Sequence, residues 1–111
     1  MARPLPLDIT TGNPYLMSEA NFEWDDAKAT ANYTNHGVAF DQAIEAFRDP
    51  FAVERIDDRE DYGEERINLV GMCRGTLLHV TYAERDGAIR IISARRATRH
   101  EQDDYYRENA P

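Results

Sequence analysis

Three polar side chains recur at every fourth position of one segment: Lys28, Asn32 and His36. On a helix they would form one stripe, where an ammonium, an amide and an imidazole could face a phosphate. Metal-free cleavage of RNA needs a base for the 2′-hydroxyl, cationic donors for the phosphorane charge, and an acid for the leaving oxygen. The same spacing fits a solvated helix face whose terminal histidine interacts with the helix dipole, so both interpretations stay open.

Four arginines gather in residues 88–100, a segment without an acidic residue: Arg90, Arg95, Arg96 and Arg99. Strand alternation would place on one face Ile89, Ile91, Ser93 and Arg95, and on the other Arg90, Ile92, Ala94 and Arg96. Guanidinium groups beside the amides of a helix that begins after Thr98 could bind an anion such as phosphate. They could equally neutralise an acidic loop.

Two further candidates lie in predicted strands. Arg66 follows Glu65 at the start of a strand and could project from the sheet, although a surface ion pair would explain it equally well. His79 lies in the middle of another strand and would share a solvent-facing side with Thr81. For His79 we expect a structural role.

Two helices and a set of strands must position these side chains. Asp25 can cap a helix that runs to about residue 35 and leaves through Gly37. Asp41 can cap a second helix, with apolar residues on one face, that ends at Asp49-Pro50. Strands follow at about 51–56, 65–73, 76–84 and 88–95, with an acidic loop at 57–63 and glycine turns at 74–75 and 86–87.

The two ends of this arrangement are also marked. Phe22 and Trp24 indicate a short strand or an apolar plug before the first helix. Thr98 and Glu101 form a capping box for a final helix that reaches about residue 108. We therefore predict an α+β fold with two N-terminal helices, an antiparallel sheet of about four strands, and a C-terminal helix.

Composition limits the class of protein. A chain of 111 residues fits one compact domain, which we place at 22–111 after a flexible N-terminal arm at 1–21. The net charge of −8 argues against a general nucleic-acid coat, although a local site is compatible with it. The single cysteine, Cys73, cannot form an intramolecular disulfide, and no apolar run is long enough to span a membrane. We expect a cytoplasmic protein without a cofactor.

The amino-acid sequence resembles that of the BrnT family of toxins over residues 22–105. The matching blocks are Phe22-x-Trp24-Asp25, Lys28, Asn32, His36-Gly37-Val38-x-Phe40, Ala43, Phe47-x-Asp49-Pro50, Tyr62-Gly63-Glu64-Glu65-Arg66, Gly71, and Ile92-Ser93-Ala94-Arg95-Arg96-Ala97-Thr98. The resemblance implies a RelE-like fold and a type II toxin that cleaves RNA without a metal and inhibits translation. It also implies a BrnA-type ribbon-helix-helix antitoxin, which neutralises the toxin and connects it to operator DNA.

The resemblance also suggests roles for individual residues. Arg66 and Arg95 would contact the phosphate or the transition state, and Lys28, His36 and Glu65 would be supporting acid–base candidates. Contacts to RNA would come from Arg90, Arg96, Arg99 and Asn32. The acidic charge, and Asn35 where the family often has a basic residue, favour an alternative: a catalytically silent homologue that binds the antitoxin and co-regulates the operon. A stand-alone interaction domain is a third hypothesis.

Overall fold

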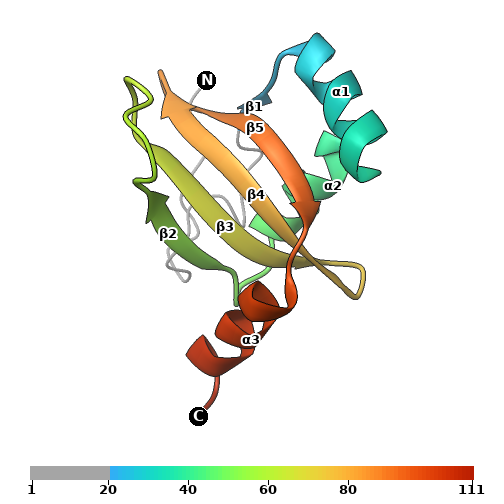
Figure 1. The fold of residues 1–111 in the computed structure, drawn as a ribbon, viewed down its shortest axis with the longest axis vertical. Coiled ribbons are helices and arrows are strands. Elements are labelled where there is room, and N and C mark those ends of the chain that lie inside the picture. The colour runs from blue at the N-terminus through green and yellow to red at the C-terminus, as the bar shows by residue number, and fades with distance from the viewer. Residues whose placement is uncertain (1–20) are drawn as a thin grey trace.

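The computed structural model describes residues 21–111, so the predicted arm at 1–21 lies outside the described residues apart from Asn21. The described chain forms three helices and five strands in one α+β unit (Figure 1). In chain order they are β1 (Phe22–Glu23), α1 (Asp26–His36), α2 (Phe40–Phe47), β2 (Val53–Asp57), β3 (Arg66–Cys73), β4 (Thr76–Arg85), β5 (Ala88–Arg96) and α3 (Arg99–Glu108).

The sheet is mixed, and the prediction of about four antiparallel strands is wrong in this respect. Its order is β1-β5-β4-β3-β2, and only β1 runs parallel to its neighbour, with Phe22 opposite Ile89. The other three pairings are antiparallel. A strand of two residues is too short to display a period, which is why the sequence left its nature open between strand and plug.

Helix ends follow the predicted chemistry at two of the three helices. The Asp25 side chain accepts a hydrogen bond from the Lys28 amide, and α1 leaves through Gly37 at a φ of 70°. Thr98 caps α3 as predicted. The predicted cap at Asp41 is wrong, because α2 begins one residue earlier and the Gln42 side chain accepts a hydrogen bond from the amide of Ala39.

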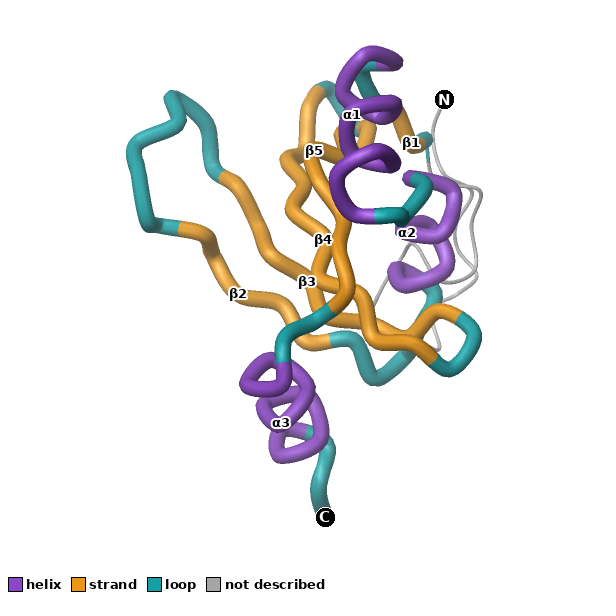
Figure 2. Tube along the Cα trace, turned by 45° about the vertical axis from the view of Figure 1, so that its right-hand side comes forward, coloured by secondary structure: helices purple, strands orange, loops and turns teal. Residues whose placement is uncertain are grey.

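The two faces of the sheet are covered differently (Figure 2). Helices α1 and α2 pack on one face, where the main core contains Phe40, Phe47, Leu69, Val80 and Ile91. The contact is close, since a Cβ on Gly71 would lie 2.4 Å from the Ala46 carbonyl oxygen. Helix α3 covers only one end of the opposite face, through a smaller cluster of Leu77, Ala97 and Tyr105.

One extra residue in β5 changes the direction of every side chain that follows it. Thr81 of β4 lies opposite Ser93, whereas the next residue, Tyr82, lies opposite Ile91, so Ile92 forms a bulge. The predicted alternation along β5 is therefore wrong beyond Ile91. Ala94 joins Ile89 and Ile91 in the core, and Ser93 and Arg95 lie on the opposite face.

A buried side chain completes the outer edge of β5. Strand β1 pairs only with Ile89 and Arg90, which leaves the backbone near Ala94 without a partner strand. The Asn32 amide occupies this position: it donates to the Ala94 oxygen at 2.8 Å and accepts from the Ala94 nitrogen at 3.1 Å. It also donates to the Val38 oxygen at 2.9 Å. Asn32 thereby ties α1 to the sheet and to the loop before α2.

Replacing Asn32 by alanine should destabilise the fold strongly. The substitution leaves three buried backbone groups without a partner, and each unsatisfied group costs about 1–3 kcal/mol. Asn35→Ala is the matched control, because Asn35 is exposed on the same helix and its loss should cost less than about 0.5 kcal/mol. Urea denaturation of both variants measures the difference, and equal free energies of unfolding would contradict this role of Asn32.

Candidate functional site

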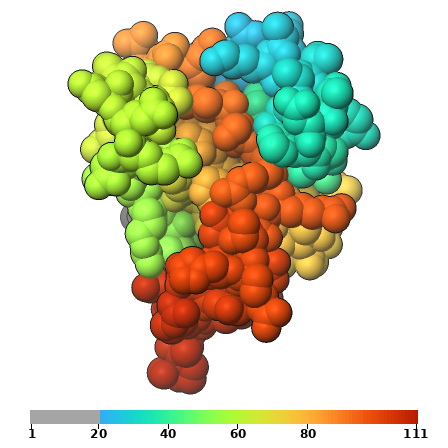
Figure 3. All heavy atoms as spheres, in the orientation of Figure 1, coloured from blue at the N-terminus to red at the C-terminus, as the bar shows by residue number. Residues whose placement is uncertain are grey.

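The sheet face opposite α1 and α2 carries a band of polar side chains, which we call the open face. The polar residues of this face are Arg55, Asp57, Arg66, Asn68, His79, Thr81, Arg90, Ser93 and Arg95. In the space-filling view the sheet is visible between the β2–β3 loop, α1 and α3 (Figure 3). Because the bulge in β5 precedes Ser93 and Arg95, both reach this face rather than the core.

Arg95 is held by Glu101 and keeps part of its donor set free. Its Nη1 and Nη2 donate to the two Glu101 carboxylate oxygens at 2.8 and 2.9 Å, and Nη1 also donates to the Arg96 carbonyl. A guanidinium has five N–H groups, so Nε–H and one Nη2–H meet no acceptor among the described residues. These two N–H groups point the same way and match two oxygens of a phosphate.

Glu101 serves several groups at once. Besides the hydrogen bonds from Arg95, its carboxylate accepts a hydrogen bond from the backbone amide of Thr98 at 2.9 Å in the capping box. One of its oxygens lies 3.7 Å from the Nε2 of His79. Hydrogen bonds from Arg95 are the main reason why the pKa of Glu101 falls from 4.5 to about 2. The carboxylate is therefore ionised at neutral pH and balances the guanidinium beside it.

His79 is the most enclosed titratable group of the open face apart from Asp57. It lies opposite Arg95 in the β4–β5 pairing, and the residue is 9% exposed. Burial, with the nearby charge of Arg95, lowers the pKa of His79 below its ordinary value of 6.5, so the imidazole is uncharged at neutral pH. The predicted solvent-facing side with Thr81 is wrong in this detail, since both residues are buried.

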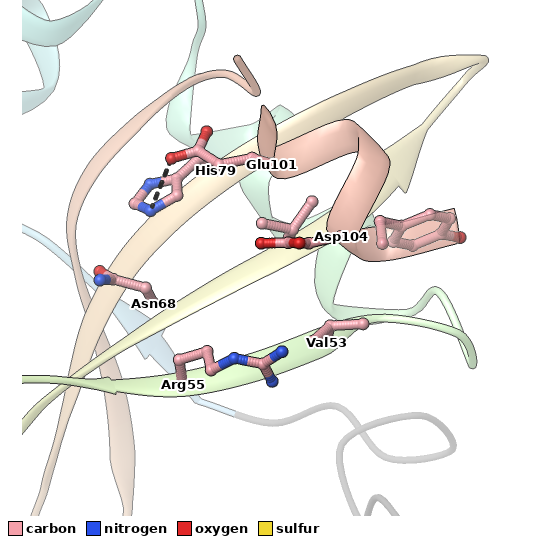
Figure 4. Close-up of a pocket in the computed structure, with 8 residues that line it drawn as sticks. Val53, Arg55, Asn68, His79, Glu101 and Asp104 are labelled. Carbon is pink, nitrogen blue, oxygen red and sulfur yellow. Dashed lines mark ion pairs between the residues drawn. The ribbon is translucent and has the colours of Figure 1, made fainter. Parts of the chain in front are cut away.

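A pocket opens beside His79 between the sheet and α3. It has a volume of about 150 Å³ and is lined by Val53, Arg55, Asn68, Val70, His79, Glu101, Asp104 and Tyr105. In the close-up, Asn68 and His79 lie at the same end of the pocket, and Arg55 extends below Asp104 (Figure 4). The Thr81 hydroxyl donates to the Asn68 oxygen at 2.7 Å and fixes that amide.

Arg66 lies at the other end of the open face. Its guanidinium stacks 4.1 Å from the centre of the Tyr62 ring, and its Nε is 3.6 Å from a Glu64 oxygen. That Nε is buried and has no hydrogen-bond partner in the described part of the chain. Arg66 lies opposite Asp57, four residues along β3 from the row that contains His79, which corresponds to about 13 Å. Arg66 and Arg95 therefore present two separate cationic positions.

The acidic loop keeps its charge partly neutralised at its base. The buried Asp57 carboxylate accepts two hydrogen bonds from the Arg59 side chain at 2.8 and 2.7 Å. These bonds are the main cause that lowers the pKa of Asp57 from 3.8 to about 2. The Tyr62 hydroxyl lies 3.5 Å from the same carboxylate, so the ring that supports Arg66 is fixed from below.

The stripe of Lys28, Asn32 and His36 on α1 does not contribute to the open face. Lys28 and His36 are exposed on α1, and among the described residues neither side chain has a hydrogen bond or ion pair with Arg66 or Arg95. Asn32 is 6% exposed and its amide is committed to backbone groups. Glu65 is exposed just before β3, next to Arg66.

The remaining arginines are distributed rather than clustered. Arg90 lies on the open face and pairs with Glu23 at 3.2 Å, and Arg99 pairs with Asp103 on the surface of α3. Arg96 is exposed and lies opposite Leu78, on the face that α1 and α2 cover. The four arginines of residues 88–100 thus point in different directions, because the bulge and the helix start separate them.

Comparison with known families decides the identity of the chain. A family model described as the ribonuclease toxin BrnT of type II toxin–antitoxin systems matches residues 24–101. The chain belongs to this family. The matched range includes Arg66, Arg95 and Glu101 of the candidate site. A BrnT toxin has RNA as its substrate class and an antitoxin as its partner. No curated protein matches the chain.

Two of the site's residues were not foreseen as such. His79 was expected to be structural, and Glu101 was recognised only as a helix cap.

Within residues 21–111 of this BrnT chain, no three His, Cys, Asp or Glu side chains are grouped to hold a metal ion. The same residues contain no helix of the length and apolar character that crossing a membrane requires.

The Arg95–Glu101 pair should make stability depend on pH. The folded pKa of Glu101, about 2, lies below its ordinary value of 4.5. The stabilisation is therefore complete above pH 4.5 and is lost as the pH falls toward 2. Glu101→Gln should lower the free energy of unfolding by about 1–3 kcal/mol at pH 7, and the gap from the unmodified protein should shrink below pH 4.5.

Denaturant titrations between pH 7 and pH 3 measure this gap. Glu108→Gln is the matched control. Glu108 lies on α3, as Glu101 does, and pairs with Arg55 of β2, but its side chain is half exposed. Its loss should cost less than about 1 kcal/mol. A gap for Glu101→Gln that stays constant down to pH 3 would contradict a depressed pKa.

Proposed function

We propose that this BrnT chain is a cytoplasmic, metal-independent endoribonuclease with a RelE-like mode of action. It cleaves RNA by attack of the 2′-hydroxyl on the adjacent phosphate and thereby inhibits translation. A BrnA-type antitoxin with a ribbon-helix-helix segment neutralises it and connects the complex to operator DNA. The BrnT family assignment supports the toxin and ribonuclease classes, and the finer statements are our proposal.

The single observation that carries the proposal is the free donor pair of Arg95. Its Nε–H and one Nη2–H are unpaired among the described residues, while Glu101 fixes the rest of the guanidinium. A donor pair that is already oriented stabilises developing phosphorane charge without a cost of reorganisation. We therefore assign Arg95 to the phosphate that is cleaved.

Arg66 is proposed to bind a neighbouring phosphate. Its side chain is three-quarters buried, with the guanidinium over Tyr62 and a buried Nε that has no hydrogen-bond partner among the described residues. The exposed quarter of the side chain is the part that a phosphate oxygen can contact. Two arginine positions about 13 Å apart along the sheet would bind a single RNA strand at two points of its backbone.

The other candidates are kept as proposals with different support. Lys28, His36 and Glu65 remain the acid–base candidates that family resemblance suggests, and Glu65 is the only one of them that lies beside Arg66. Further phosphate contacts are proposed for Arg90, Arg96 and Arg99. Asn32 is left out, because both of its amide N–H donors are used by backbone oxygens and the residue is buried.

Two observations favour the second candidate function, an antitoxin-binding homologue without catalysis. Glu101 already occupies two of the five Arg95 N–H donors, and the whole chain carries a net charge of −8. Both reduce the attraction for a polyanion. In this case the protein would bind its antitoxin and modulate operator binding without cutting RNA.

Induction of the protein in bacteria separates the two functions. For the ribonuclease we expect growth arrest with fragmentation of total RNA, and relief of both when the adjacent gene is co-expressed. Growth curves and RNA electrophoresis give the two measurements. Normal growth with intact RNA, although soluble protein accumulates and binds its antitoxin, would favour the silent homologue.

Substitution of Arg95 tests the proposed phosphate contact. Arg95→Lys keeps the positive charge but loses the paired N–H donors. It should lower the cleavage rate by roughly 100-fold, which is the effect of removing one oriented hydrogen-bond donor from the active sites of other enzymes. Arg48→Ala is the matched control, because Arg48 is exposed at the end of α2 on the opposite face. An Arg95→Lys protein that is folded and fully toxic would refute the assignment.

A further inference from the structure

We infer that His79 is the general base of this BrnT chain and that Glu101 positions both His79 and Arg95 around one reacting nucleotide. The inference rests on the proposed ribonuclease function and names the site at which that reaction takes place. It moves the reacting base from the acid–base candidates Lys28, His36 and Glu65 to the pocket between the sheet and α3.

The first support is the geometry of the pair. His79 and Arg95 are directly opposite each other on adjacent antiparallel strands, which places their Cα atoms about 5 Å apart. Both side chains lie on the open face, and both reach the Glu101 carboxylate. A phosphate on the free donors of Arg95 would therefore lie within reach of the imidazole.

The second support is the state of the imidazole. The 3.7 Å from its Nε2 to Glu101 exceeds hydrogen-bonding distance, so Glu101 does not occupy this nitrogen while the ring is uncharged. Its surroundings keep the ring uncharged at neutral pH. A neutral ring nitrogen can accept a proton through its lone pair. An exposed, solvated histidine can do the same, but its ring has no fixed orientation.

The third support is the pocket itself. Its volume of about 150 Å³ is below the roughly 300–1,000 Å³ of sites that enclose a whole small ligand, so it accommodates part of a nucleotide. Asn68 and Arg55 line it with an amide and a guanidinium. These groups can donate hydrogen bonds to the hydroxyl and carbonyl oxygens of a ribose or base.

The step is balanced without a cofactor. His79 takes the proton of the 2′-hydroxyl as the 2′-oxygen forms a bond to phosphorus. The bond from phosphorus to the 5′-oxygen breaks, and that oxygen takes a proton from water. The products are a 2′,3′-cyclic phosphate and a 5′-hydroxyl, and the imidazolium returns its proton to solvent. Arg95 stabilises the additional negative charge during this step.

His36 is the rival base, and its location argues against it. It is exposed at the end of α1, a helix whose core contacts are on the face that α2 also covers. Figure 2 places α1 and α2 on one side of the sheet and α3 away from them. Among the described residues, no hydrogen bond or ion pair joins His36 to Arg95 or Glu101, whereas His79 lies directly opposite Arg95.

The chain contains three histidines, which allows one matched experiment. The variants His79→Gln, His79→Val, His36→Gln and His100→Gln are purified, and cleavage of a 5′-labelled single-stranded RNA is followed. Both His79 variants should cleave about 100- to 10,000-fold more slowly, the range typical of a general base. His36→Gln tests the rival base and should lose far less activity than the His79 variants. His100→Gln, on the exposed surface of α3, is the control and should match the unmodified protein.

Two further readouts separate catalysis from structure. Antitoxin binding and circular dichroism should be unchanged in the valine variant, since valine suits a buried strand position. Added imidazole should restore part of the cleavage by His79→Ala, which a purely structural role would not permit. RNA cleaved by the unmodified protein should carry 2′,3′-cyclic phosphate ends.

The outcomes distinguish the two levels of inference. If the unmodified protein fails to cleave RNA, the proposed ribonuclease function fails. If it cleaves RNA and the folded His79 variants cleave equally fast, or if only His36→Gln abolishes cleavage, the assignment of His79 is overturned while the ribonuclease function stands.

Discussion

One additional residue in β5 decides which side chains meet. Without the bulge at Ile92, strand alternation would turn Arg95 toward the core and Ala94 toward the open face. The bulge keeps the small Ala94 against α1 and brings Arg95 beside His79. Bulges commonly redirect a side chain in this way near functional sites. The Asn32 amide then binds the backbone of Ala94, so the irregular part of the strand is anchored from outside the sheet.

The start of α3 links folding and the site through a single carboxylate. Glu101 belongs to the capping box of the helix and at the same time binds Arg95. The helix itself is held against the sheet by Tyr105, whose hydroxyl donates to Asp49 at 2.7 Å. The same Asp49 oxygen accepts the Met72 amide, so α3, β3 and the end of α2 share one anchor. The orientation of the guanidinium thus depends on the packing of a helix beyond it.

Local chemistry in the sequence predicted most of the fold and less of the site. Caps at Asp25 and Thr98 and the glycine turns are signalled by a few neighbouring residues, and these predictions are confirmed. The bulge has no such signal, so the faces of Ser93 and Arg95 were predicted wrongly. The meeting of His79, Arg95 and Glu101 depends on a register between strands and on the direction of α3, which no periodicity within one segment reveals. Apolar residues on both faces of β5 were the one available hint of irregularity.

The Asn32 contact also sets an order of events during synthesis. Asn32 and its partner Ala94 are 62 residues apart in the chain, and β1 likewise pairs with β5. The meander from β2 to β5 can form from neighbouring segments, and α2 can pack on β3, where Gly71 meets Ala46, but α1 packs against β5 and must wait for this strand to emerge. At about 5–20 residues per second, the ribosome leaves the sheet-facing side of α1 uncovered for about 3–12 s. The burial of α1 is therefore delayed until β5 is made, although α1 is made before the other helices.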